Sequence, residues 1–125
     1  MRLGDRAEVA RAFDAASVSA FCVLAGLKDG GCGGRLPEPL IAGLFSYLLG
    51  VKLPGQGTNY LKQELTFLAP ARIGERLSAV VEITRLRPEK HLCDLTTTCS
   101  GADGRLICKG RALVLVRDVG RPMEA

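Results

Sequence analysis

Hydrophobic and polar residues alternate along several stretches of the chain, which is the pattern of half-buried β-strands. The clearest stretch is residues 77–86, where Leu77, Ala79, Val81 and Ile83 occupy alternate positions. Similar patterns predict strands at residues 59–67, 91–99 and 106–116, and a weaker one predicts a strand at residues 7–13. The Asp-Gly pair at residues 103–104 favours the positive φ angles of a hairpin turn. The second half of the chain is therefore predicted to be an antiparallel sheet.

Apolar residues at helical spacing predict two helices before this sheet. Asp14 is a favourable N-cap for a helix over residues 15–25, and Gly26 is suited to end it. A second helix is predicted from the Pro37-Glu38-Pro39 segment to Gly50, because proline suits the first turn of a helix. Hardly any of this helix is charged, so we expect a curved sheet to bury it almost all round.

Two segments are predicted to lack regular structure. Residues 26–35 include five glycines, which favour a loop, and residues 118–125 are expected to be a frayed tail. The predicted order is strand, helix, helix and four strands. This order indicates a single domain over residues 1–125, with its core at about residues 4–116.

The composition supports a soluble domain that could bind a small anionic ligand. The chain has 125 residues, of which 47% are hydrophobic and 24% charged, and no apolar run is long enough for a membrane span. The first residues lack the pattern of a signal peptide, so we expect a cytoplasmic protein that does not bind membranes. The net charge is +4, but the basic residues are scattered without an aromatic platform, which argues against nucleic acid. A phosphate-bearing ligand such as coenzyme A is compatible.

The five cysteines do not indicate a structural site. They are odd in number and contain no CxxC pair, so neither a disulfide framework nor a zinc site is suggested. We expect reduced thiols, and we expect no metal or other cofactor.

Three segments, LFSYLLG at residues 44–50, LPGQG at 53–57 and YLKQELTF at 60–67, resemble the MaoC-like (R)-specific enoyl-CoA hydratases and related 3-hydroxyacyl-thioester dehydratases. The Ile73-Gly74-Glu75 motif follows in the family's order, and the resemblance covers nearly all of residues 4–116. It implies an α+β hotdog fold, in which a curved antiparallel sheet wraps a long central helix. It also implies a homodimer whose sheets join edge to edge.

The same resemblance implies that the ligand is an acyl-CoA or acyl-carrier-protein thioester, bound along the subunit interface. On this basis Ser46, Phe45 and Leu49 are expected to bind substrate. Ser46 matches the family's substrate-side serine, although a helical serine can instead bond back to a carbonyl of its own helix. Independently of the resemblance, Leu113 and Leu115 face one side of the last strand and Val114 and Val116 the other, which favours a covered surface.

The residues that carry the chemistry of this family are not in their usual places. The family's loop after the first helix reads GDxNPxH, and its Asp and His polarise water for addition to the enoyl double bond. Counted from Gly26 without gaps, Leu27 holds the Asp position and Cys32 the His position. The family's HGM at the start of the central helix is replaced by Pro37-Glu38-Pro39, so the oxyanion donor is also altered. The prediction is an acyl-thioester-binding protein without the usual catalytic pair.

Two carboxylates are candidate catalytic residues. Asp29 could take the acid position if the gap in the loop lies earlier, or it could be a solvated loop residue. Glu38 could activate water against a thioester carbonyl, as an acidic residue near the helix start does in hotdog thioesterases, or it could only complement the helix dipole. His91, the single histidine, matches no catalytic position. The alternatives to a hydratase-like protein are therefore a thioesterase using Glu38 and a non-catalytic acyl-binding or structural subunit.

Overall fold

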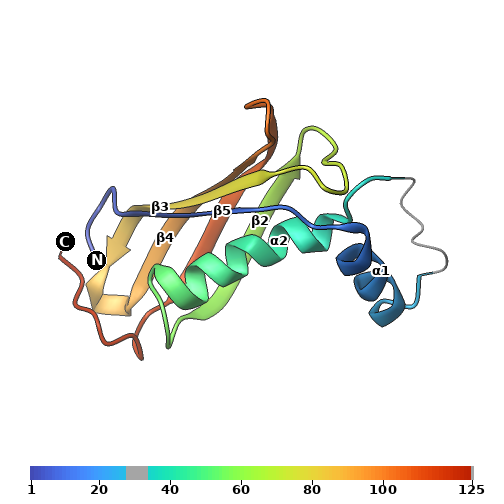
Figure 1. The fold of residues 1–125 in the computed structure, drawn as a ribbon. Helices are drawn as coiled ribbons and strands as arrows, with labels where there is room; N and C mark the ends of the chain where they lie inside the picture. Colours follow the sequence, from blue (N-terminus) through green and yellow to red (C-terminus); the bar gives the residue numbers. More distant parts are fainter. Residues whose placement is uncertain (28–33, 125) are drawn as a thin grey trace.

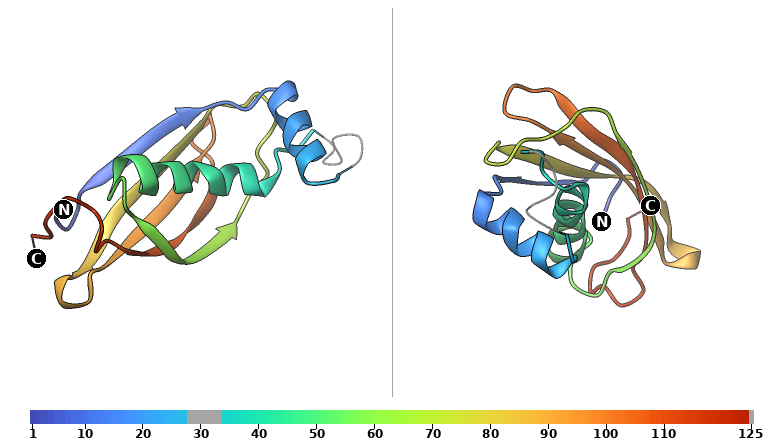
Figure 2. Two further views of the ribbon diagram at one scale, coloured as in Figure 1. Left: turned by 90° about the horizontal axis from the view of Figure 1, so that it is seen from below. Right: turned by 90° about the vertical axis from the view of Figure 1, so that its right-hand side faces the viewer.

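A curved antiparallel sheet holds a long helix on its concave side (Figures 1 and 2). The structure is a computed structural model that describes residues 1–27 and 34–124. Within these residues five strands form one sheet in the order β1-β3-β4-β5-β2. The strands are β1 (Arg6–Arg11), β2 (Asn59–Phe67), β3 (Leu77–Arg87), β4 (Leu92–Ser100) and β5 (Leu106–Leu115), and the helices are α1 (Ala15–Leu24) and α2 (Glu38–Tyr47). The predicted element order and the predicted helix wrapped by a sheet are confirmed.

Helix α1 begins and ends where the sequence predicts. The backbone N–H of Ser17 donates to Oδ1 of Asp14 at 2.8 Å, and this bond holds the pKa of Asp14 below its ordinary value. Gly26 follows the helix with a φ of 74°, in the left-handed region that glycine adopts easily. Val18 and Cys22 are the buried residues of the helix. Figure 1 places α1 beside the N-terminal end of α2.

Helix α2 is buried on one side only. Leu44 and Phe45 are buried, and the π-helical turn η1 (Leu48–Lys52) continues the buried row. Ser46 and Tyr47, by contrast, are exposed. The expectation of burial almost all round is therefore wrong for this single chain. The sheet covers one side of the helix and α1 meets only its first turns, so the opposite side remains open (Figure 2).

The inner face of the sheet forms the rest of the core. Leu77, Ala79, Val81 and Ile83 of β3 are at most 1% exposed, as their alternation predicts. In β2 the alternation fails at Leu61, which is 53% exposed. The pairing of β2 with β5 shifts between Tyr60 and Lys62, so Leu61 is the extra residue of a β-bulge.

The C-terminal segment up to Glu124 contacts the N-terminus, so the expected frayed tail is wrong for residues 118–124. The Met1 ammonium donates to the Pro122 carbonyl at 2.8 Å, and the Glu124 N–H donates to the Met1 carbonyl at 2.7 Å. Val119 and Met123 pack against the core. These contacts join residues more than 100 positions apart, which local composition cannot predict. No helix in the described part of the chain has the length and apolar character needed to cross a bilayer.

Candidate functional site

A pocket of about 820 Å³ lies where α1, the start of α2 and the segment after β2 meet. This volume is typical of small-molecule sites. The lining is mostly apolar and consists of Phe21, Ala25, Leu27, Arg35, Leu36, Pro37, Glu38, Pro39, Ile41, Phe67, Ala69, Pro70 and Ala71. Of these residues only Arg35 and Glu38 carry a charge. The pocket could therefore hold a largely apolar ligand with one polar end.

The first turn of α2 offers this pocket few hydrogen-bond donors. The N–H of Leu36 donates to the Ala71 carbonyl at 2.8 Å, and that of Leu40 donates to the Pro37 carbonyl at 3.1 Å. Pro37 and Pro39 have no N–H. Among residues 36–40 the Glu38 N–H is the one amide without a partner in the described part of the chain. This end of the helix can thus offer a carbonyl oxygen a single amide and the positive end of the helix dipole.

The structure places the predicted site residues at different depths. Glu38 is exposed and lines the pocket. Ser46 is exposed two turns further along α2, whereas Phe45 and Leu49 are at most 1% exposed and belong to the core. None of these last three lines the pocket at the helix start. Asp29, like Cys32, lies outside the described residues. The predicted catalytic and substrate-binding roles remain predictions.

His91 is remote from the pocket. It lies in the turn between β3 and β4, is exposed, and adopts a left-handed φ of 56°. The pocket wall at Pro70 lies at the other end of β4, where Arg105 of the β4–β5 hairpin contacts the Pro70 carbonyl. The nine residues of β4 span about 30 Å at the usual rise of a strand. His91 therefore cannot act as a base in this pocket of the single chain.

The described cysteines are unsuited to nucleophilic chemistry. Cys22, Cys93, Cys99 and Cys108 are buried and unbridged, which agrees with the expectation of reduced thiols for these four. Burial raises the pKa of Cys93 and Cys99 to about 12 and that of Cys108 to about 11. Cys93, Cys99 and Cys108 are thus neutral thiols near pH 7, and the thiolate is the nucleophilic form.

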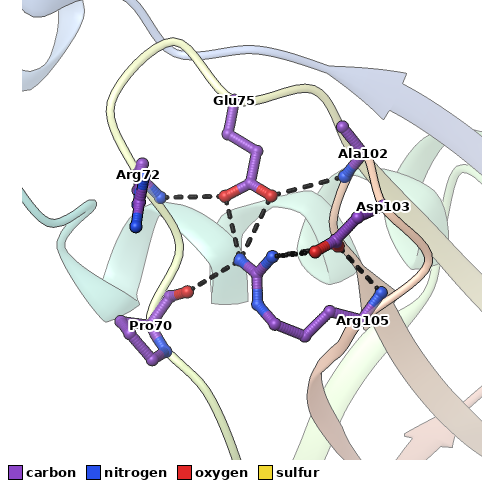
Figure 3. A network of polar contacts seen from close by, with 6 residues as sticks. All are labelled: Pro70, Arg72, Glu75, Ala102, Asp103 and Arg105. Carbon is purple, nitrogen blue, oxygen red and sulfur yellow. Dashed lines mark hydrogen bonds and ion pairs between the residues drawn. The ribbon is translucent and has the colours of Figure 1, made fainter.

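A polar network fixes the pocket wall formed by residues 69–71 (Figure 3). Nη2 of Arg105 donates to Oε1 of Glu75 at 3.0 Å and to the Pro70 carbonyl at 2.9 Å. Nη1 of Arg105 donates to Oδ1 of Asp103 at 2.9 Å. Glu75 Oε1 also accepts the backbone N–H of Arg72 at 3.1 Å. The network ties the loop before β3 to the β4–β5 hairpin and so holds the backbone that lines the pocket.

We expect this network to make stability depend on pH. The hydrogen bond from Arg105 holds the pKa of the Glu75 carboxyl below its ordinary value. Because the folded pKa is lowered, the carboxylate stabilises the fold above about pH 4.5, and this stabilisation is lost as the pH falls through the folded pKa. Urea unfolding of Glu75→Gln should show lower stability than wild type near pH 7 and a smaller loss on acidification.

Asp103→Asn is the matched control, because the Asp103 side chain is 63% exposed whereas that of Glu75 is 13% exposed. Exposed ion pairs contribute little to stability, so this variant should lose less than Glu75→Gln. Equal stability of Glu75→Gln and wild type at neutral pH would contradict the role given to the network.

Comparison with known proteins identifies the family of this chain. The (R)-specific enoyl-CoA hydratase of Aeromonas caviae is 36% identical over 126 residues, which cover 91% of this chain and 94% of that protein. The chain belongs to the (R)-specific enoyl-CoA hydratase family. The alignment is longer than the covered part of this chain, so about a dozen residues of that relative have no counterpart here. No model of a protein family matches the chain.

Two further comparisons agree with this family. The (R)-specific enoyl-CoA hydratase of Rhodospirillum rubrum is 46% identical over 77 residues, which cover 62% of this chain and 53% of that protein. The chain thus matches only about half the length of this relative. The solved (R)-hydratase from A. caviae involved in PHA biosynthesis superposes with a TM-score of 0.84 at 35% identity, over 91% of this chain and 96% of that one. The predicted hotdog fold and family resemblance are confirmed.

Proposed function

We propose that this chain binds acyl thioesters in the pocket at the start of α2. The observation that carries the proposal is the apolar lining of this pocket beside the N-terminus of α2, in a chain of the hydratase family. Phe21, Ile41 and Phe67 would surround the acyl chain, because apolar burial is the main source of affinity for such a group. The Glu38 N–H would face the thioester carbonyl.

Blocking the pocket tests this proposal. Ala25 lines the pocket at the end of α1, whereas Ala20 lies on the same helix, is exposed and does not line it. Calorimetric titration with butyryl-CoA and octanoyl-CoA should show that Ala25→Trp weakens binding by about tenfold or more, the loss of roughly 1.4 kcal/mol. Ala20→Trp should bind like wild type. Equal affinity in both variants, or no binding by wild type, would contradict a site in this pocket.

A thioesterase is the second candidate function, because Glu38 is the acidic residue of the described pocket lining. A positioned general base contributes roughly 10²- to 10⁴-fold to a rate. If Glu38 activates water, Glu38→Gln should slow the release of free coenzyme A thiol from acyl-CoA by that factor while binding persists. Equal rates in the two proteins exclude Glu38 as the base. If the protein binds acyl-CoA but neither hydrolyses nor hydrates it, the remaining alternative is a non-catalytic acyl-binding subunit.

We also propose that the chain forms a homodimer. β2 is an edge strand of the sheet, and exposed apolar residues occur on it and on the open side of the helical segment: Leu61 is 53%, Tyr47 44% and Val51 60% exposed. Open edges and apolar patches of this kind are usually covered by a partner. Sedimentation velocity at micromolar concentration should therefore give a dimer, and a stable monomer would contradict the proposal.

A further inference from the structure

Two arginines lie directly opposite one another at the edge of the proposed site. Arg35 and Arg72 form an antiparallel β-bridge. The bridge is flanked by the hydrogen bond from Leu36 to Ala71, at 2.8 Å, and by one from the Ile73 N–H to the Gly34 carbonyl, at 3.2 Å. Side chains directly opposite in such a pairing project from the same face. Arg35 lines the proposed pocket, whereas Arg72 lines a neighbouring hollow that shares Pro70 with it, so the pair lies at the boundary between the two.

This arrangement is electrostatically unfavourable for the protein alone. Like charges directly opposite one another in a β-pairing destabilise it. Both residues are exposed, and neither side chain forms an ion pair with an acidic residue within the described part of the chain. The nearby Arg105, in contrast, is neutralised by Glu75 and Asp103. A bound anion would relieve the repulsion between these two arginines.

The polar network of Figure 3 holds the backbone of Arg72 but does not form an ion pair with the Arg72 guanidinium. Glu75 accepts the backbone N–H of Arg72, while its carboxylate is ion-paired with Arg105. The Arg72 backbone N–H is thus bound by Glu75, while the Arg72 guanidinium has no acidic partner among the described residues. Two guanidinium groups with five N–H donors each match the oxygens of a phosphate group.

We propose that Arg35 and Arg72 together bind a phosphate group of the acyl carrier. This inference rests on the proposed function, because it assigns the polar end of the same acyl thioester. The phosphate could belong to coenzyme A or to the phosphopantetheine arm of a carrier protein, which share this chemistry. The acyl chain then enters the apolar pocket while the phosphate stays at its edge, in solvent.

Binding of thioesters with and without phosphate tests the pair. Calorimetry should show that wild type binds butyryl-CoA at least tenfold more tightly than butyryl-pantetheine, which has no phosphate. Arg35→Gln and Arg72→Gln should each weaken butyryl-CoA binding by about tenfold and leave butyryl-pantetheine binding unchanged. Arg117→Gln removes the same charge after β5, at the His91 end of the sheet, and should bind both ligands like wild type.

Butyryl-4′-phosphopantetheine identifies the phosphate that is bound. If its affinity depends on the two arginines, they bind the phosphate shared by coenzyme A and carrier proteins. If only butyryl-CoA binding depends on them, they bind the phosphates of its adenosine part. Thermal unfolding supplies a second measurement, because removing a repulsive charge should leave the Tm of Arg35→Gln and Arg72→Gln at or above that of wild type.

Three results would overturn the inference. The first is a variant carrying both Arg35→Gln and Arg72→Gln that binds butyryl-CoA as tightly as wild type, while Ala25→Trp still blocks binding. This result rejects the phosphate site but leaves the proposed function intact. The second is a lower Tm of the arginine variants together with an equal loss of affinity for all ligands, which would assign the arginines a structural role. The third is a wild type that binds none of these thioesters, which rejects both proposals.

Discussion

Crotonyl-CoA hydration is expected to be at least about 100-fold slower than the roughly 10 per second of a typical enzyme. On the family resemblance, Leu27 and Cys32 occupy the positions of the catalytic Asp and His. His91 lies about one strand length, roughly 30 Å, from the pocket wall. The first turn of α2 offers one unpartnered amide among the described residues, so stabilisation of the enolate-like oxygen is also reduced. Loss of the enoyl-thioester absorbance measures the rate.

A turnover near 10 per second would contradict this expectation and direct attention to Asp29. In that case Asp29→Asn should abolish the rate, because a carboxamide cannot donate or accept the proton. Asp118→Asn is a suitable control, since Asp118 is an exposed residue beyond β5. A slow wild type that still binds butyryl-CoA would support the binding function.

Truncating Phe45 to alanine should destabilise the fold by about 3–5 kcal/mol, the usual cost of deleting a buried aromatic side chain. Phe45 is completely buried in the core, whereas its neighbour Ser46 is exposed. Ser46→Ala, in the same helix, should change stability by no more than about 0.5 kcal/mol. The urea midpoint of unfolding measures both effects, provided that the free energy of unfolding has the same slope against urea concentration in each variant and in wild type. A small loss in Phe45→Ala would show that the cavity is tolerated, as in a substrate tunnel.

Ser46→Trp separates folding from binding at the neighbouring position. Because Ser46 is exposed, the indole should fit without overpacking the core and the Tm should stay close to that of wild type. If Ser46 lines an acyl site, this variant should lose butyryl-CoA affinity. Unchanged affinity would remove Ser46 from the site.

Most of the fold could be predicted because local patterns determine it. The alternation in β3 and the Asp14 cap depend on neighbours in sequence, and both are confirmed. The bulge at Leu61 and the ordered C-terminal segment depend on pairing with distant strands or with the N-terminus. Such contacts leave no periodic signal, so the alternation predicted at Leu61 and the predicted frayed tail are wrong.

The candidate site could be predicted only in part. Glu38 was identified from its place in the first turn of α2, and it lines the pocket. The pairing of Arg35 with Arg72 and of Glu75 with Arg105 joins loops that are 30 or more residues apart. No spacing rule connects such positions, and only the fold brings them together.

Helix α2 has buried and exposed positions side by side in one short segment. Leu44 and Phe45 hold the helix to the sheet, whereas Gly43, Ser46 and Tyr47 face away from the core. Changes at the outward positions can therefore alter what the helix meets without a large loss of stability. A family built on this arrangement can diversify its ligands or assembly partners through substitutions that natural selection on folding hardly opposes.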